Sequence, residues 1–122
     1  MIPNRIPTKK VVGGRTTWTL NGKRHRVDGP AIIFSDESEA WFLHDKLHRI
    51  DGPARTYNCG SERWFRHGQF HRVDGPALVE IGGRNRWFLH GIEYHNLENY
   101  AKDAKLLDCE ILALMLTWGE IK

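Results

Sequence analysis

The sequence predicts a mostly β protein, a single-layer antiparallel meander of 23-residue β-hairpin repeats followed by a C-terminal capping α-helix. The motif His-Arg-(Val/Ile)-Asp-Gly-Pro-Ala occurs at residues 25–31, 48–54 and 71–77. Self-similarity with a period of about 20–50 residues is the signature of repeat architectures. After residue 96 the apolar spacing changes to three or four residues, which indicates a helix. Tryptophan keeps the step of the motif at Trp18, Trp41, Trp64 and Trp87.

The prolines set the boundaries of the repeats. Pro30, Pro53 and Pro76 are 23 residues apart, and Pro7 lies one step earlier. The predicted parts of the chain are an N-terminal tail (1–6), a repeat domain (7–95) and a C-terminal helix (96–122). The predicted repeat units are 7–29, 30–52, 53–75 and 76–95.

Each unit is expected to hold two strands and a short returning segment. The first strand follows the proline, as in residues 31–34, whose β-branched and aromatic side chains suit a strand. The second carries the tryptophan, as in residues 17–20, and ends in a tight turn at Asn21-Gly22, where both residues tolerate positive φ. Residues 23–26 then pair back onto it. Asp-Gly-Pro bends the chain into the next unit, with glycine expected to supply an unusual φ. The structural positions of this bend are Asp28, Asp51, Asp74, Gly29, Gly52 and Gly75.

The C-terminal helix is expected to begin after an Asn96 N-cap and to stop at Gly119. Leu106, Leu112 and Leu116 widen its apolar face beyond a single stripe. A terminal helix of this kind shields the open end of a repeat stack. The alternative is that the helix adds a surface for a partner or for a second copy of the chain.

Composition and charge narrow the class of protein. Cys59 and Cys109 form neither a metal-binding pattern nor a disulfide framework, which favours a reducing, cytoplasmic location. No run of about 18 apolar residues is present, so no membrane span is expected. Residues 1–92 hold 15 Lys/Arg against 9 Asp/Glu, whereas residues 93–122 hold 3 against 6. A basic repeat part attracts nucleic acid or anionic lipid, but interspersed charges are also typical of an ordinary solvated sheet.

The repeat resembles a MORN repeat. It is similar to the variant found in small bacteriophage and giant-virus proteins, in which tandem copies read W-x-x-N-G-x-x-H-R-x-D-G-P-A. The resemblance covers residues 7 to about 92 and implies a meander of hairpins that binds proteins or, in some cases, anionic lipids. It also implies a virus-encoded inhibitor of a host protein, acting in the host cytoplasm. This chain has Arg-x-Asp-Gly-Pro where a typical MORN unit has Gly-x-Gly, which makes lipid binding less transferable.

The repeated histidines do not predict a metal site. Equivalent residues of neighbouring units lie two strands apart, roughly 9–10 Å, so His25, His48 and His71 cannot share one ion whose ligands sit about 2 Å away. A site within one unit, formed by His44, His48 and Asp51, stays open. No nucleophile or phosphate-binding loop stands in a recognisable setting, so no enzyme activity and no cofactor are predicted.

The repeat also predicts a row of arginines with aspartates and a row of tryptophans along the sheet. Arg26 and Asp28 are two residues apart on an extended segment and face the same side, which predicts a ladder of ion pairs between neighbouring units; an arginine row that binds phosphates is the alternative. The tryptophan row is expected to be core, with a stacking platform for single-stranded nucleic acid as the alternative.

The predicted function is that of a non-enzymatic protein–protein interaction module. One form that this interaction can take is a homodimer held together through the C-terminal helix. The alternative is a binder of nucleic acid or anionic lipid through the basic repeat face. Specificity is expected at positions that differ between the units and on the helix. These candidate partner-binding residues are Arg55, Arg66, Phe70, Glu80, Leu106, Leu112 and Leu116.

Overall fold

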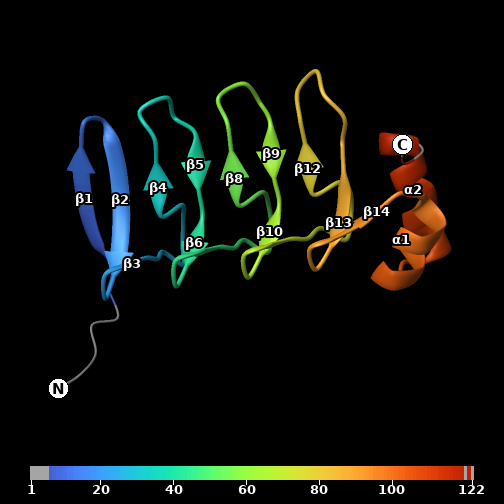
Figure 1. Cartoon of the computed structure of the whole chain (residues 1–122), viewed down its shortest axis with the longest axis horizontal. Coiled ribbons are helices and arrows are strands. Elements are labelled where there is room, and N and C mark those ends of the chain that lie inside the picture. The colour runs from blue at the N-terminus through green and yellow to red at the C-terminus, as the bar shows by residue number, and fades with distance from the viewer. Residues whose placement is uncertain (1–5, 120, 122) are drawn as a thin grey trace.

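The computed structural model describes residues 6–119 and 121. Hairpins stand side by side in one row, and two helices lie at the C-terminal end of the row (Figure 1). All strand pairs are antiparallel, so the predicted mostly β fold with a helical C-terminus is confirmed.

The larger sheet has eight strands and follows the chain order. The order is β1-β2-β4-β5-β8-β9-β12, and β3 pairs with β2 as the predicted returning segment. Its strands are β1 (Thr8–Val12), β2 (Arg15–Leu20), β3 (Lys23–Arg24), β4 (Ile32–Ile33), β5 (Glu39–Ala40), β8 (Arg55–Thr56), β9 (Glu62–Arg63) and β12 (Leu78–Val79).

Three two-stranded hairpins continue the tryptophan strands beyond this sheet. They pair β6 (Phe42–Leu43) with β7 (Lys46–Leu47), β10 (Phe65–Arg66) with β11 (Gln69–Phe70), and β13 (Trp87–Leu89) with β14 (Ile92–Tyr94). The backbone N–H groups of Arg26, Arg49 and Arg72 donate to the carbonyls of Phe42, Phe65 and Phe88 at 3.1, 3.1 and 3.2 Å. These bonds join each unit to the next.

The hairpin turns have the positive φ values that the sequence predicts. Asn21 and Gly22 have φ of 52° and 79°, and His67 and Gly68 have 50° and 80°. Two consecutive residues with positive φ match the right-handed twist of the flanking strands. His44 tolerates the same conformation at 48° without a following glycine.

The sheet has two faces because successive side chains point to opposite sides. One face, called here the Trp face, carries the repeat tryptophans and the arginines of the motif. The other, the Phe face, carries Phe42, Phe65 and Phe88. The apolar core of the repeats lies mainly on the Phe face, where Ile32, Ala40 and Phe42 pack together.

The C-terminal segment forms two helices rather than the single predicted helix. They are α1 (Leu97–Ala104) and α2 (Asp108–Trp118). Lys105 adopts a left-handed conformation (φ 58°) that ends α1, and the Glu110 carboxylate accepts the Leu107 N–H at 2.8 Å to start α2. The predicted start is confirmed, since the Asn96 side chain accepts from the Asn99 N–H at 2.8 Å. Gly119 follows α2 as the predicted stop and donates its N–H to the Met115 carbonyl at 2.9 Å.

The two helices cover the last unit of the sheet. Trp87, Tyr100 and Leu114 form a cluster in which Trp87 is 3% and Tyr100 0% exposed. The Tyr100 hydroxyl donates to the backbone carbonyls of Arg72 and Gly75, so α1 is also tied to the preceding unit. Neither helix is long and apolar enough to cross a bilayer, and no other helix is found among the described residues.

Candidate functional site

Arginine–tryptophan stacks run along the Trp face. The Arg26 guanidinium carbon lies 3.8 Å from the centre of the Trp18 ring, and the Arg49–Trp41 distance is 4.0 Å. Arg72 lies 3.8 Å from Trp64. A guanidinium over an indole face is attracted by the ring quadrupole. Trp18, Trp41 and Trp64 are therefore half-buried partners of arginine, and among the four repeat tryptophans only Trp87 belongs to a buried core.

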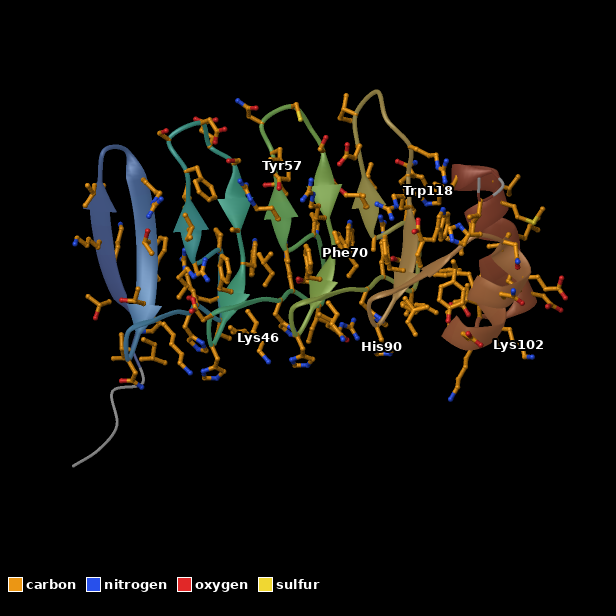
Figure 2. The ribbon with its side chains drawn as sticks, in the orientation of Figure 1. Lys46, Tyr57, Phe70, His90, Lys102 and Trp118 are labelled. Carbon is orange, nitrogen blue, oxygen red and sulfur yellow. The ribbon has the colours of Figure 1, made fainter. Side chains whose placement is uncertain are left out.

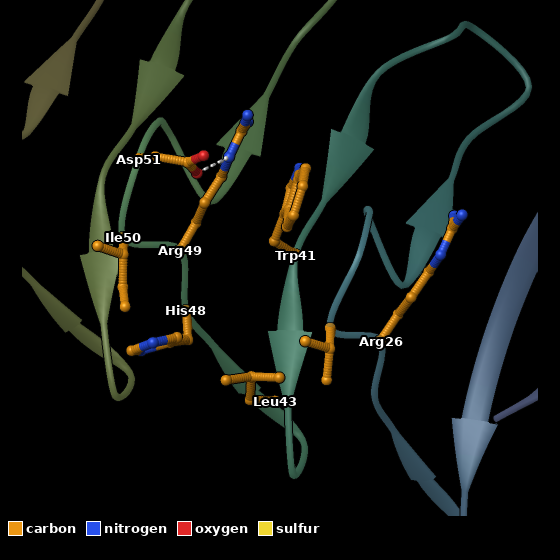
Figure 3. A pocket seen from close by; sticks show the side chains of 8 residues that line it. Arg26, Trp41, Leu43, His48, Arg49, Ile50 and Asp51 are labelled. Carbon is orange, nitrogen blue, oxygen red and sulfur yellow. Dashed lines mark hydrogen bonds and ion pairs between the residues drawn. The ribbon is translucent and has the colours of Figure 1, made fainter. Parts of the chain in front are cut away.

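Each stacked arginine is also held by its own motif. Arg49 donates from Nε to Asp51 at 3.2 Å (Figure 3). It also donates from Nη1 to the Pro53 carbonyl at 3.3 Å. The ion pairs thus lie within one motif, and the predicted ladder between neighbouring units is wrong. An arginine that already has a carboxylate, a carbonyl and a ring against it has few donors left for a phosphate.

The glycine of the motif leaves room for the arginine side chain and does not supply an unusual φ. Gly52 is not among the positive-φ glycines, which corrects the sequence expectation. A Cβ atom at Gly52 would lie 2.7 Å from the Arg49 guanidinium carbon. The same close approach recurs at Gly29 and Gly75, at 2.6 and 2.8 Å from their arginines.

The motif histidines join neighbouring units. The Nδ1 atom of His48 accepts the His67 N–H at 2.9 Å, and the centres of the two rings lie 4.4 Å apart, with the rings tilted by 39°. The same pairing joins the histidines at 25 and 44 and those at 71 and 90. Burial first, and then the neighbouring histidine, lowers the pKa of His48, which keeps the ring neutral and able to accept.

This histidine pairing was missed by the sequence reasoning, although a signal was present. The histidines that begin the hairpin turns stand 19 residues after those of the motif. The site within one unit that the sequence left open, at His44, His48 and Asp51, is not assembled, because His44 pairs with His25 whereas His48 pairs with His67. The described residues contain no group of His, Cys, Asp and Glu arranged to hold a metal ion.

The Phe face carries a basic, aromatic hollow of about 460 Å³. The Arg55 guanidinium lies between Phe34 and Tyr57, at 4.3 and 4.1 Å from their ring centres. Arg55 also donates to the backbone carbonyls of Glu39 and Thr56. The predicted site residue Glu80 lies on the same face and pairs with Arg63 at 3.5 Å.

The structure does not gather the remaining predicted site residues into one surface. Phe70 stacks between Phe65 and Phe88 at 4.3 and 4.8 Å, so it belongs to the packed sheet (Figure 2). Leu106 is partly buried and packs against the Trp87 cluster. Arg66 lines a groove on the Trp face, and in the part of the chain that is described no acidic side chain pairs with it.

Helix α2 is apolar on both sides. Leu114 and Trp118 face the sheet, whereas Leu112, Met115 and Leu116 are 56%, 48% and 80% exposed. These three residues are called the outer stripe. The sequence reasoning identified two of its members and missed Met115, which the i, i+3, i+4 spacing places on the same side.

Comparison with protein-family models, with curated proteins and with solved structures gives no match. The class of protein is therefore inferred from the sequence repeat and from the geometry of these surfaces. The outer stripe of α2 offers apolar contact, and the two faces of the sheet offer cationic and aromatic contact.

Proposed function

We propose that this chain is a MORN-like repeat protein that acts as a non-enzymatic protein–protein interaction module and binds its partner through the outer stripe of α2. The exposure of Leu112, Met115 and Leu116 carries this proposal. Apolar surface left in water costs about 25 cal/mol per Å², and contiguous exposed apolar patches mark interaction sites. A helix that is apolar all round is normally buried on both sides.

The partner is a protein, and the stripe also suits a second copy of this chain, because a two-fold axis brings the same patch of both subunits together. The resemblance to virus-encoded repeats supports a role as an inhibitor of a host protein, such as a defence component in the host cytoplasm. The motif side chains support the absence of an enzyme role. The histidine, the aspartate and the arginine each occur three times, the arginines pair with the aspartates, and the histidines accept backbone N–H groups of the neighbouring unit.

The alternative function is binding of anionic lipid or nucleic acid through the basic repeat face. The motif arginines of the Trp face disfavour it, because Arg26, Arg49 and Arg72 are already paired with the carboxylates of Asp28, Asp51 and Asp74. The hollow around Arg55 is the observation that keeps it as an alternative. A steep loss of affinity with added salt would identify this second function.

Replacing Leu112 and Leu116 together by glutamate is expected to abolish association and to preserve the fold. Both side chains point away from the sheet, so their loss opens no cavity, whereas two carboxylates in an apolar contact leave unpaired buried charge. Sedimentation velocity measures self-association, and cross-linking to host proteins followed by mass spectrometry measures binding to another protein. Circular dichroism and the melting temperature report the fold.

The matched control is Val11→Glu with Val12→Glu. These side chains are 60% and 63% exposed at the opposite end of the sheet and receive the same change in charge. The control is expected to associate like the wild type. The proposal fails if the Leu112/Leu116 variant folds and still associates. It also fails if the variant unfolds, because the outer stripe would then belong to the core. Loss of a dimer alone would identify a second copy as the occupant.

A further inference from the structure

Grooves recur on the Trp face between successive motif segments. Groove one lies between Val27 and Ile50 over Trp41, with a volume of about 320 Å³. Groove two lies between Ile50 and Val73 over Trp64, with a volume of about 140 Å³. Figure 3 shows groove one between Arg26 and the Arg49–Trp41 stack.

The corresponding position in the last unit is partly covered by helix α2 of the chain itself. Leu114 and Trp118 of α2 pack against the Trp87 cluster, and α2 borders Val73. Val73 is 41% exposed, whereas Val27 and Ile50 are 75% and 69% exposed. The chain thus contains one covered and two open versions of the same surface.

Groove one has the same apolar character as the covered position. Leu43 lines groove one and occupies the same position in its repeat as Leu89 does two repeats later. Leu89 is 5% exposed and belongs to the buried cluster that contains Leu114. Groove two carries Arg66 at this place in the repeat, and its guanidinium has no acidic partner among residues 6–119. Groove one therefore suits an apolar side chain, and groove two suits a carboxylate.

We propose that grooves one and two bind a helix of the partner protein, with an apolar residue over Trp41 and a carboxylate on Arg66. The proposal rests on the protein-binding function above and adds a second contact surface to it. A helix is the expected occupant, because α2 packs at the equivalent position of the last unit. One repeat spans two strand spacings, roughly 9–10 Å. Seven residues of a helix span about 10.5 Å and return to the same face.

A peptide derived from α2 provides a defined probe. It comprises residues 106–119 with Leu112→Lys and Leu116→Lys, which keep it soluble and leave Leu114 and Trp118 intact. Leu107→Glu adds a carboxylate seven residues before Leu114, and a matched peptide carries Leu107→Gln. Fluorescence anisotropy of the labelled peptides measures affinity. Indole N–H resonances show where they bind, and Trp41 is a sensitive reporter because its buried Nε1 has no acceptor among the described residues.

The Glu peptide is expected to bind the full-length protein saturably and to shift the Trp41 resonance. Val27→Glu with Ile50→Glu should weaken binding by at least about tenfold, because the new carboxylates oppose an apolar contact. The control, Ile81→Glu with Ile92→Glu, alters side chains that are 62% and 63% exposed outside the grooves and should leave the affinity unchanged. Arg66→Ala should bring the affinity of the Glu peptide down to that of the Gln peptide.

Three results would overturn the inference. These are an absence of saturable binding, equal binding by the Val27/Ile50 variant, and a shift of the Trp87 resonance in place of Trp41. The last would mean that the peptide displaces α2. The Leu112→Glu/Leu116→Glu protein keeps both grooves and should bind the peptide like the wild type. Failure of the groove proposal is therefore distinguishable from failure of the outer stripe.

Discussion

Replacing Trp87 by alanine is expected to lower the free energy of unfolding by roughly 3–5 kcal/mol, as large-to-small changes in a packed core do. Trp87 is 3% exposed and meets Tyr100 edge to face at 4.9 Å. It also contacts the cluster that holds Leu114, so it joins the sheet to both helices. Its loss removes packing from all three elements.

Equilibrium urea unfolding of Trp87→Ala and Trp18→Ala measures this effect. Trp18 is half-buried near the open end of the sheet and stacks on Arg26 and more loosely on Lys9, at 5.6 Å. Its replacement is therefore expected to cost clearly less than replacement of Trp87. Equal costs would contradict the assignment of Trp87 as the centre of the helix–sheet contact.

Acidification below pH 6.5 is expected to destabilise the fold. His25, His48 and His71 are each 7% exposed and accept a backbone N–H through Nδ1. Burial and then the adjacent histidine lower the pKa of each below the ordinary value of 6.5, and Arg66 adds to the effect at His48 and His71. The unfolded chain therefore binds protons at a higher pH than the folded chain does. Stability is full above pH 6.5 and is lost as the pH falls through the lowered values.

Thermal melts between pH 7.5 and pH 5 test this expectation. The three histidines act in the same direction, because the unfolded chain takes up protons that the folded chain does not, so the melting temperature should fall over this range. Asp45 and Glu93 stay ionised there, because hydrogen bonds from arginine lower their pKa values. His48→Asn should reduce the dependence on pH, whereas replacement of the exposed His95 should not. A melting temperature that is constant over this range would contradict the histidine contacts.

Much of the fold follows from local signals in the sequence. Asn21-Gly22 specifies a turn with two positive φ values, and Asn96 specifies a helix start, because each feature depends on residues close in the chain. The break between the helices could not be predicted in this way. Leu106 and Leu107 fit a continuous helical period, and the left-handed Lys105 accompanies the packing of both helices on Trp87.

The candidate site was predictable only in part, because exposure depends on which elements meet. Leu112 and Leu116 fell outside the main stripe of the helix and are exposed. Phe70 differs between units and for that reason looked like a specificity residue, yet it fills the core between two phenylalanines. The arginine and the aspartate of the motif were correctly placed on one side, but their pairing was wrongly expected between neighbouring units, and the stacking of the arginine on tryptophan depends on strands that only the fold brings together.

Native-state amide hydrogen exchange tests the central claim, a stack whose units are joined by the same contacts every 23 residues. Backbone N–H groups that donate to the neighbouring unit should be strongly protected, including those of the histidines that begin the turns, and turn N–H groups that make no such bond should exchange fast. The protected groups should recur at Trp18, Trp41 and Trp64, at Arg26, Arg49 and Arg72, and at His44, His67 and His90. Protection with no 23-residue period, or limited to one end of the chain, would contradict the account.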